Sequence, residues 1–247
     1  MKKLTLLIII LLSYIEVGNA QSSNSDFNYN TENYKNEISF EALQLINGVY
    51  QMSYERYIWN NFSAALAVGY KGKKGLVKIS GIDGEKIKTD EIYYSGYQII
   101  PEIRYYIKKT TLRNLTGFYV GAYLKYNNYS SDLNGSYTSS ENIEYALRFD
   151  SKISITSAGL MVGYKLPISK HFNIDFIIAG PGSGHYKFKL KNQKDLPDEF
   201  YDDLNNALEK YNLLDLINSN FRFSEVNNTS KFTALSFRYG IALCYTF

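Results

Sequence analysis

The sequence contains little cysteine, little proline and no long hydrophobic run beyond its N-terminus. Its 247 residues include one cysteine and four prolines. A single cysteine excludes an intramolecular disulfide framework and a cysteine-rich zinc site. Lysine and arginine total 27 against 24 acidic residues, so the chain lacks the strong basic field that nucleic-acid binding requires. No apolar run after the N-terminal segment reaches the length of a membrane-spanning helix.

Aromatic residues are abundant instead. The chain has 24 tyrosines and 14 phenylalanines but one tryptophan, and 45% of its residues are hydrophobic. This content is enough to build a core, and the length suits one domain or two small ones, so wholesale disorder is excluded. The mean hydropathy is nevertheless only −0.27.

Residues 1–20 have the pattern of a secretory signal peptide. Lys2 and Lys3 precede a short apolar run at residues 4–12, and small residues at 18–20 suit cleavage after Ala20. Residues 21–35 are rich in Asn and Ser and are expected to form a flexible segment. We therefore predict export, with a folded domain over residues 36–247.

Alternation of apolar with small or polar residues organises the rest of the chain. A period of two is typical of strands whose two faces meet different surroundings. The C-terminal run is the clearest, and its large apolar face comprises Leu235, Phe237, Tyr239, Ile241, Leu243, Tyr245 and Phe247. Similar runs occur near residues 38–46, 50–58, 62–71, 97–107, 118–126, 157–165 and 172–178. They predict about eight strands, an even number as bacterial membrane barrels require.

The expected connections alternate between short and long. Residues 59–61, 108–115 and 168–170 are short, whereas residues 72–92, 130–151 and 191–231 are long. Asn47-Gly48 is a favoured pair for a two-residue hairpin and is the one tight connection on the long side. Short inner turns and longer outer loops are characteristic of bacterial barrels.

The distribution of charge distinguishes a membrane barrel from a soluble one. The small or polar face of the strands carries six charged residues that we expect to form a network in the lumen: Glu55, Glu102, Arg104, Lys125, Asp175 and Arg238. We expect this network to plug the barrel, because eight strands leave room only for side chains. The opposite face would expose a large apolar band in water. A secreted soluble barrel that binds an apolar ligand is the alternative.

Aromatic residues gather at the ends of the expected strands, as in the two girdles of membrane barrels. Tyr70, Tyr97 and Tyr126 lie at the expected outer ends. The inner ends carry Trp59, Phe62, Tyr105, Phe118, Tyr164, Phe172, Tyr245 and Phe247.

Several of these runs resemble a known family. Residues 54–57 (YERY), 101–106 (PEIRYY) and 117–123 (GFYVGAY) are similar to segments of small, functionally uncharacterised outer-membrane β-barrel proteins of the Bacteroidota, with an eight-stranded, OmpA/OmpX-like architecture. Residues 237–247 resemble the terminal strand that the outer-membrane assembly machinery recognises. The resemblance implies that Tyr245 and Phe247 form this assembly signal, and that the protein resides in the bacterial outer membrane.

Two proline-containing segments predict irregular strands. Pro101 cannot donate to a strand ladder, so we expect a bulge or a local break there. The Pro181-Gly182-Ser183-Gly184 segment predicts a bulge near the outer rim.

Candidate chemistry is sparse. Ser183 and His185 share one face of a strand, so an outer-membrane acyl hydrolase that acts on lipid is an alternative function. Spacing of this kind arises easily by chance, and a solvated rim histidine is the simpler interpretation. His171 has no partner at metal-ligand spacing. We therefore predict no catalytic residue, no metal and no cofactor.

The last long connection carries the only helical pattern. Asp195 and Pro197 are a start signal, and Phe200, Leu204, Ala207, Leu208 and Tyr211 recur at helical spacing. This helix is expected either to pack over the barrel mouth or to bind a partner. The sequence thus predicts an all-β, closed antiparallel transmembrane barrel of about eight strands with one helix in the last outer loop. We expect a monomer that contacts lipid and no nucleic acid, with a structural role or recognition through its outer loops.

Overall fold

The computed structural model describes residues 34–73, 75, 80–107, 113–192, 196–210, 223 and 229–247. The predicted signal peptide and nearly all of the predicted flexible segment lie outside these residues. The elements are β1 (Asn36–Glu41), the 3-10 helix η1 (Leu43–Asn47), β2 (Val49–Trp59), β3 (Phe62–Lys71), β4 (Ile87–Thr89), β5 (Tyr94–Tyr106), β6 (Gly117–Thr138), β7 (Glu144–Pro167), β8 (Phe172–Asn192), α2 (Glu199–Lys210) and β9 (Thr229–Thr246).

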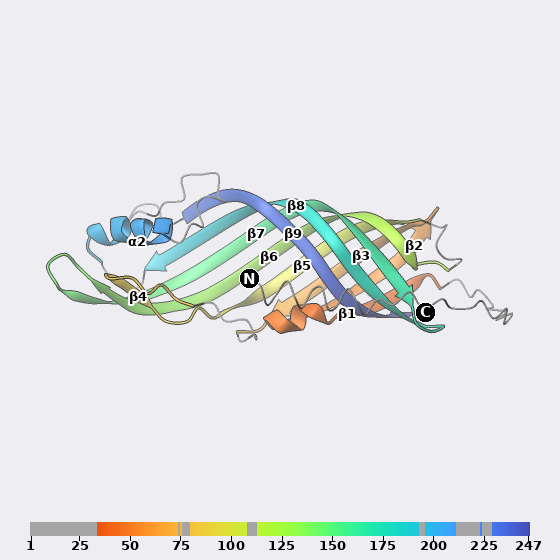
Figure 1. The fold of residues 1–247 in the computed structure, drawn as a ribbon, viewed down its shortest axis with the longest axis horizontal. Coiled ribbons are helices and arrows are strands. Elements are labelled where there is room, and N and C mark those ends of the chain that lie inside the picture. Colours follow the sequence, from red (N-terminus) through yellow and green to blue (C-terminus); the bar gives the residue numbers. More distant parts are fainter. Residues whose placement is uncertain are drawn as a thin grey trace, which may run out of the picture. The chain divides into compact units, whose positions relative to one another are not determined.

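Eight of the strands form a closed antiparallel ring (Figure 1). Their order is β1–β2–β3–β5–β6–β7–β8–β9, and β9 pairs with β1 to close it, with Ile38 opposite Tyr245. The closure continues to the C-terminal residue, because the Phe247 N–H donates to the Asn36 carbonyl at 2.9 Å and the Asn36 N–H to the Phe247 carbonyl at 3.1 Å. The prediction of a closed eight-stranded barrel with one helix is therefore confirmed.

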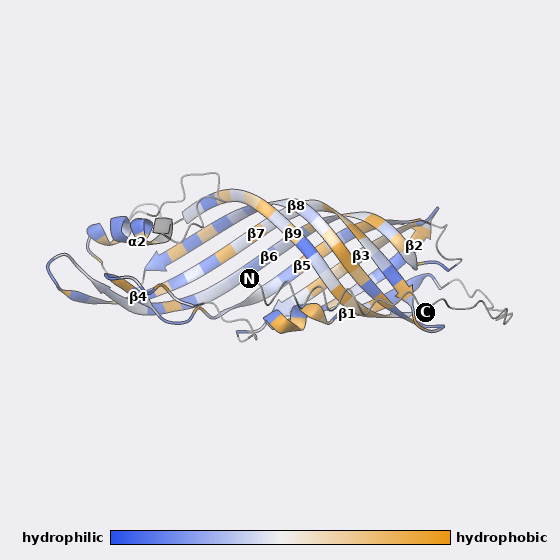
Figure 2. Ribbon diagram, in the orientation of Figure 1, coloured by the Kyte–Doolittle hydropathy of each residue, from blue (hydrophilic) through white to orange (hydrophobic). Residues whose placement is uncertain are grey.

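On β9, large apolar residues alternate with small or polar ones, and this pattern determines which face of the strand points inward. Large residues from Leu235 to Phe247 are exposed on the outside, whereas Arg238, Ala242, Cys244 and Thr246 are buried inside. Figure 2 shows the same alternation of hydrophobic and hydrophilic residues on the neighbouring strands of the ring. Small inward residues such as Ala242 leave room in a narrow barrel for a few long side chains.

The three predicted short turns lie at one end of the ring. Asn60 and Asn61 connect β2 to β3 with φ angles of 43° and 73°. Asparagine tolerates this left-handed conformation, which the tightest hairpin turns require. Residues 168–171 connect β7 to β8, and residues 107–116, partly outside the described residues, connect β5 to β6.

The opposite end differs from the prediction of a long loop at residues 130–151. β6 continues to Thr138 and β7 begins at Glu144, so only residues 139–143 form the turn. Their pairing is unbroken, with Ser131 opposite Ser151 and Tyr137 opposite Tyr145. The strands persist because the inward side chains of this segment are buried by other parts of the chain. β6 to β9 thus run on beyond the ends of β1, β2 and β3 (Figure 1).

The Asn47-Gly48 hairpin prediction was wrong. β1 ends at Glu41, and η1 occupies the connection to β2. Gly48 ends η1 with a φ of 71°, and its N–H donates to the Leu45 carbonyl at 2.8 Å. The Glu41 carboxylate accepts from the Leu43 N–H at 3.3 Å and so diverts the chain from the strand direction.

The proline-containing strands are more regular than predicted. β5 runs through Pro101 without a register shift, so there is no bulge, but the ladder to β6 lacks pairs at Ile100 and Pro101, which is the local break expected there. β8 also continues through residues 181–184. Its bulge lies earlier, between Ile177 and Gly180, where the register to both neighbours shifts.

The extended ends of β6, β7 and β8 hold a hydrophobic core of their own, which we call the outer cap. The cap joins β4 and α2 to these strands through eight buried side chains: Ile87, Tyr137, Leu147, Phe149, Leu190, Phe200, Leu204 and Phe223. Phe200 stacks on Phe149 with ring centroids 5.6 Å apart. Phe200 and Leu204 belong to the predicted helical stripe, whereas Tyr211 and the side chain of Leu208 lie outside the described residues.

None of the helices in the described ranges is both long and apolar enough to cross a membrane.

Candidate functional site

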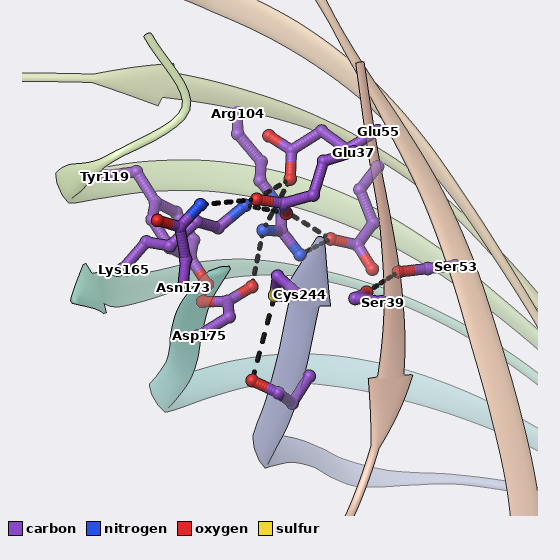
Figure 3. Close-up of polar contacts among 12 residues, drawn as sticks. Glu37, Ser39, Ser53, Glu55, Arg104, Tyr119, Lys165, Asn173, Asp175 and Cys244 are labelled. Atoms are coloured by element: carbon purple, nitrogen blue, oxygen red, sulfur yellow. Dashed lines mark hydrogen bonds and ion pairs between the residues drawn. The ribbon is translucent and has the colours of Figure 1, made fainter. Parts of the chain in front are cut away.

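Arg104 lies at the centre of a charged network inside the barrel (Figure 3). Its Nη1 atom is 3.0 Å from Glu55 Oε2 and 2.7 Å from Asp175 Oδ2, and its Nη2 atom is 2.7 Å from Glu102 Oε2. The side chain is only 4% exposed. The planar guanidinium suits this position because its fixed fork of donors serves three carboxylates at once.

A second buried cation continues the network toward the short-turn end. Lys165 is fully buried, with its Nζ atom 2.5 Å from Glu37 and 2.8 Å from Glu55. Asn173 donates to the other Glu37 oxygen at 2.9 Å. Glu37 and Lys165 were not among the residues predicted for the network. Strand parity was the available signal, because Glu37 alternates with Ile38 and Phe40, which point outward.

The structure brings together five of the six residues that we expected in the lumen. Arg238 reaches Glu102 at 2.5 Å and so joins the Arg104 cluster. Lys125 is the exception, because it is half-buried on the inward face of β6 and makes no ion pair with any described residue. Arg104, Arg238 and Lys165 are each paired with carboxylates, as buried charges require.

Tyrosines fill the space around the charges. Tyr106 donates to Glu55 at 2.6 Å, Tyr119 to Asp175 at 2.8 Å and Tyr123 to the Gly180 carbonyl at 2.9 Å. Gly163 makes room for this packing, since a Cβ there would lie 2.3 Å from the Tyr119 ring. The cavity that remains between Ser53, Arg104 and Arg238 is about 10 Å³, close to the space of one water molecule.

Nearer the outer cap, polar atoms of the lumen lack partners. Asn127 Oδ1, Ser157 Oγ and Arg238 Nη1 have no hydrogen-bond partner among the described residues, although each residue is at least nine-tenths buried. Buried polar groups of this kind are usually satisfied by water. The lumen is therefore nearly filled around Arg104, with room for about one water molecule, and is also suited to water near Ser157.

The outer cap is held by polar contacts of α2. Asp203 accepts from Lys86 at 2.9 Å and from the Tyr137 hydroxyl at 2.8 Å. Glu199 accepts from the Ser140 N–H at 3.1 Å. Burial and the hydrogen bond to Asp203 raise the pKa of Tyr137, so it remains a neutral donor. Tyr137, Tyr145 and Tyr201 pack in or against the cap core, which accounts for their abundance in the outer segments.

Docking of α2 is expected to weaken in acid. The hydrogen bond from the Ser140 N–H lowers the pKa of Glu199, so its contribution to docking is complete above its ordinary pKa of 4.5 and is lost as the pH falls below that value. The hydrogen bond to Asp203 raises the pKa of Lys86, so this contact persists until alkaline pH. At pH 3.5 we expect amide hydrogen exchange in α2 of the wild type to rise toward that of Glu199→Gln.

The comparison with Glu199→Gln at each pH removes the intrinsic pH dependence of exchange. At pH 7 the variant should exchange roughly twofold to fivefold faster in α2 than the wild type, the scale of an exposed charged contact. Exchange in the strands of the ring serves as the internal control. A difference of the same size at pH 3.5 and pH 7 would contradict this assignment.

The residues considered for catalysis do not form a site. Ser183 and His185 both point to the outside of β8, where they are exposed, and no hydrogen bond joins them. His171 stacks on Tyr245, and its Nδ1 lies 2.9 Å from the Thr246 carbonyl. Within the described residues, no group of three or more His, Cys, Asp or Glu side chains could hold a metal ion.

Aromatic residues meet across strands where the girdles were expected. Phe62 contacts Tyr105, with centroids 5.0 Å apart, and Phe118 contacts Tyr164 at 4.6 Å. In the expected outer girdle, Tyr97 contacts Tyr126, with ring centroids 6.2 Å apart. Tyr245 and Phe247 both point outward at the short-turn end of β9 and stack on each other at 6.3 Å.

Comparisons with known proteins give a family and a distant structural likeness. A family model described as a protein of unknown function, DUF3575, matches residues 43–199. The crystal structure of CarO from Acinetobacter baumannii is 13% identical, with a TM-score of 0.36, over 87% of this chain and 98% of that one. No curated protein matches.

Proposed function

This chain belongs to DUF3575, a family of proteins of unknown function, and we propose that it is an integral outer-membrane β-barrel whose lumen is closed. Its role in this proposal is structural, or recognition by the outer cap. The proposal rests on the described side chains, because neither the family description nor the distant structural likeness supplies a function.

The outward apolar band is the observation that carries the proposal. On every strand of the ring the outward face presents large apolar side chains, such as Ile103 (59% exposed), Leu160 (69%) and Leu235 (78%). A monomer in water does not tolerate so wide an apolar surface, whereas hydrocarbon solvates it. Closure of the ring also pairs the backbone polar groups that a bilayer cannot satisfy.

The filled lumen supports a role other than a channel. Arg104, Lys165 and the buried tyrosines occupy the cross-section, and the cavity among Ser53, Arg104 and Arg238 is about 10 Å³. The same charged interior argues against a soluble barrel for an apolar ligand, since such a ligand would meet carboxylates. Ser183 and His185 are exposed and no hydrogen bond joins them, so they give no support to an acyl hydrolase.

The proposal also gives the barrel an orientation in the membrane and names its other partners. The short turns would face the periplasm after export through the predicted signal peptide, and the outer cap would face the exterior. The assembly machinery would recognise Tyr245 and Phe247 on the outward face of β9. The cap, built on continuous strands, would offer a rigid surface to an external partner, with the barrel as a monomer.

Membrane fractionation with gel electrophoresis of boiled and unboiled samples tests the proposal. We expect the chain in the outer-membrane fraction and a faster band without boiling, because a closed barrel resists detergent unfolding. In a planar lipid bilayer the purified chain should give no steady conductance. Recovery in the soluble periplasmic fraction, identical mobility in both lanes, or stable open-channel currents would each contradict part of the proposal.

A further inference from the structure

Four lysines form a patch on the outside of the barrel wall. Lys152 on β7, Lys187 and Lys189 on β8, and Lys231 on β9 all point outward and are exposed. We call these four residues the lysine patch. None of them forms an ion pair with a described residue. Lys191, the next outward lysine of β8, lies opposite Asp150 and is not counted in the patch.

The four lysines face one another in two cross-strand pairs. Lys152 lies directly opposite Lys189, and Lys187 directly opposite Lys231. Like charges in directly opposed positions destabilise a sheet pair. An anion held between the ammonium groups would relieve this repulsion, which the patch repeats on two adjacent strand pairs.

The patch begins where the apolar band ends. On β7 the outward residues above Leu160 are small or hydroxylated until Lys152, and on β9 only Thr233 separates Leu235 from Lys231. On β8, Ser183 and His185 separate Pro181 from Lys187. A charge at this height would meet the head groups of the outer leaflet. On β5 the corresponding outward position is Ser95, which lies across β6 from Lys152.

An apolar hollow lies below the patch on two of the same strands. Its volume is about 550 Å³, and its walls include Leu160 and Val162 of β7 and Ala179 and Pro181 of β8, with Ile103 and Tyr105 on the far side. Pro181 and Lys187 are six residues apart, roughly 20 Å along the strand. The hollow and the patch therefore suit the tail and the head group of one lipid.

We propose that the lysine patch and the apolar hollow together bind a phosphorylated glycolipid of the outer leaflet. The ammonium groups would hold the phosphates through charge-assisted hydrogen bonds, and the hollow would take an acyl chain. This inference rests on the proposed membrane orientation, because it requires the patch to lie at head-group height. Ser183 and His185 then belong to the rim of a lipid-binding surface.

Native mass spectrometry of the full chain, folded in neutral detergent, tests the proposal with three probes. These are bisphosphorylated lipid A, the same lipid with both phosphates removed, and inorganic phosphate. We expect one bisphosphorylated lipid per chain and binding at least about tenfold weaker without its phosphates. The Lys152→Gln/Lys187→Gln/Lys189→Gln/Lys231→Gln variant should lose this preference.

A matched variant removes the same charge elsewhere. Lys35→Gln/Arg56→Gln/Lys73→Gln/Lys88→Gln changes four exposed cations outside the patch and should retain lipid binding. Equal binding by both variants, equal binding of the dephosphorylated lipid, or displacement of lipid by inorganic phosphate would overturn the inference. The boiled and unboiled mobility of the same samples shows separately whether the barrel is intact, so failure of this inference is distinguishable from failure of the proposed function.

Discussion

Replacing Arg104 by methionine is expected to lower the free energy of unfolding by about 3–5 kcal/mol, the cost of leaving buried charges without their partner. Arg104 contacts Glu55, Glu102 and Asp175 within 3.0 Å, in a part of the lumen where the remaining cavity is about 10 Å³. The measurement is urea unfolding of the chain refolded in lipid vesicles, followed by the difference in gel mobility between folded and unfolded chains.

Lys125→Met is the matched control for this prediction. Lys125 also points into the lumen, but no described carboxylate pairs with it, so its removal leaves no buried anion behind. We expect an unchanged or slightly higher stability for this variant. If both methionine variants lost the same stability, the ion pairs of Arg104 would not be the reason for its effect.

Replacing Ile241 by arginine is expected to destabilise the barrel by about 2–4 kcal/mol, the cost of a cation on the lipid face near the middle of a bilayer. Ile241 lies at the centre of the outward apolar run of β9, which extends from Leu235 to Phe247. The same unfolding experiment in vesicles measures the loss.

Thr233→Arg places the same charge on the same face of β9, beyond the apolar run. Its cost should be only about 0–1 kcal/mol, because the site lies near the interface. The two variants place the same cation on the same face of β9 at two different depths. If Ile241→Arg were as well tolerated as Thr233→Arg, the outward band would not be embedded in hydrocarbon.

The alternation of residues was enough to predict the ring and most of the charged lumen. On β9, a single large residue at every second position indicates both the strand and its outward face, so the inward position of Arg238 follows from parity. Glu37 was missed because the predicted run began at Ile38, whereas β1 begins at Asn36. Contacts between Lys165 and Glu37, 128 positions apart, depend on closure of the ring and have no local signal.

The outer cap was the part that sequence patterns misjudged. On β7, Leu160 and Val162 point outward, whereas Leu147 and Phe149 point inward and are buried. Alternate residues of β7 continue to point to the same two faces along the whole strand. The hydrophobic residues lie on the outward face in the barrel wall and on the inward face in the cap, where an apolar core replaces the apolar exterior. A search for one continuous apolar face therefore ends at this change and assigns residues 130–151 to a loop. Likewise, η1 depends on Glu41 accepting N–H groups of Leu43 and Ile241, a contact between distant strands.

The filled lumen also imposes an order of events on assembly in the proposed membrane. A folded cap that buries Phe149, Phe200 and Leu204 against one another could not pass through a lumen whose cavity beside Arg104 is about 10 Å³. The extended ends of β6–β9 and the α2 segment must therefore reach the exterior as unfolded chain. The charges around Arg104 can pair only as the ring closes, and the cap core can form only after its strands have crossed. Translocation would thus precede folding of the cap, although the cap strands are continuous with those of the wall.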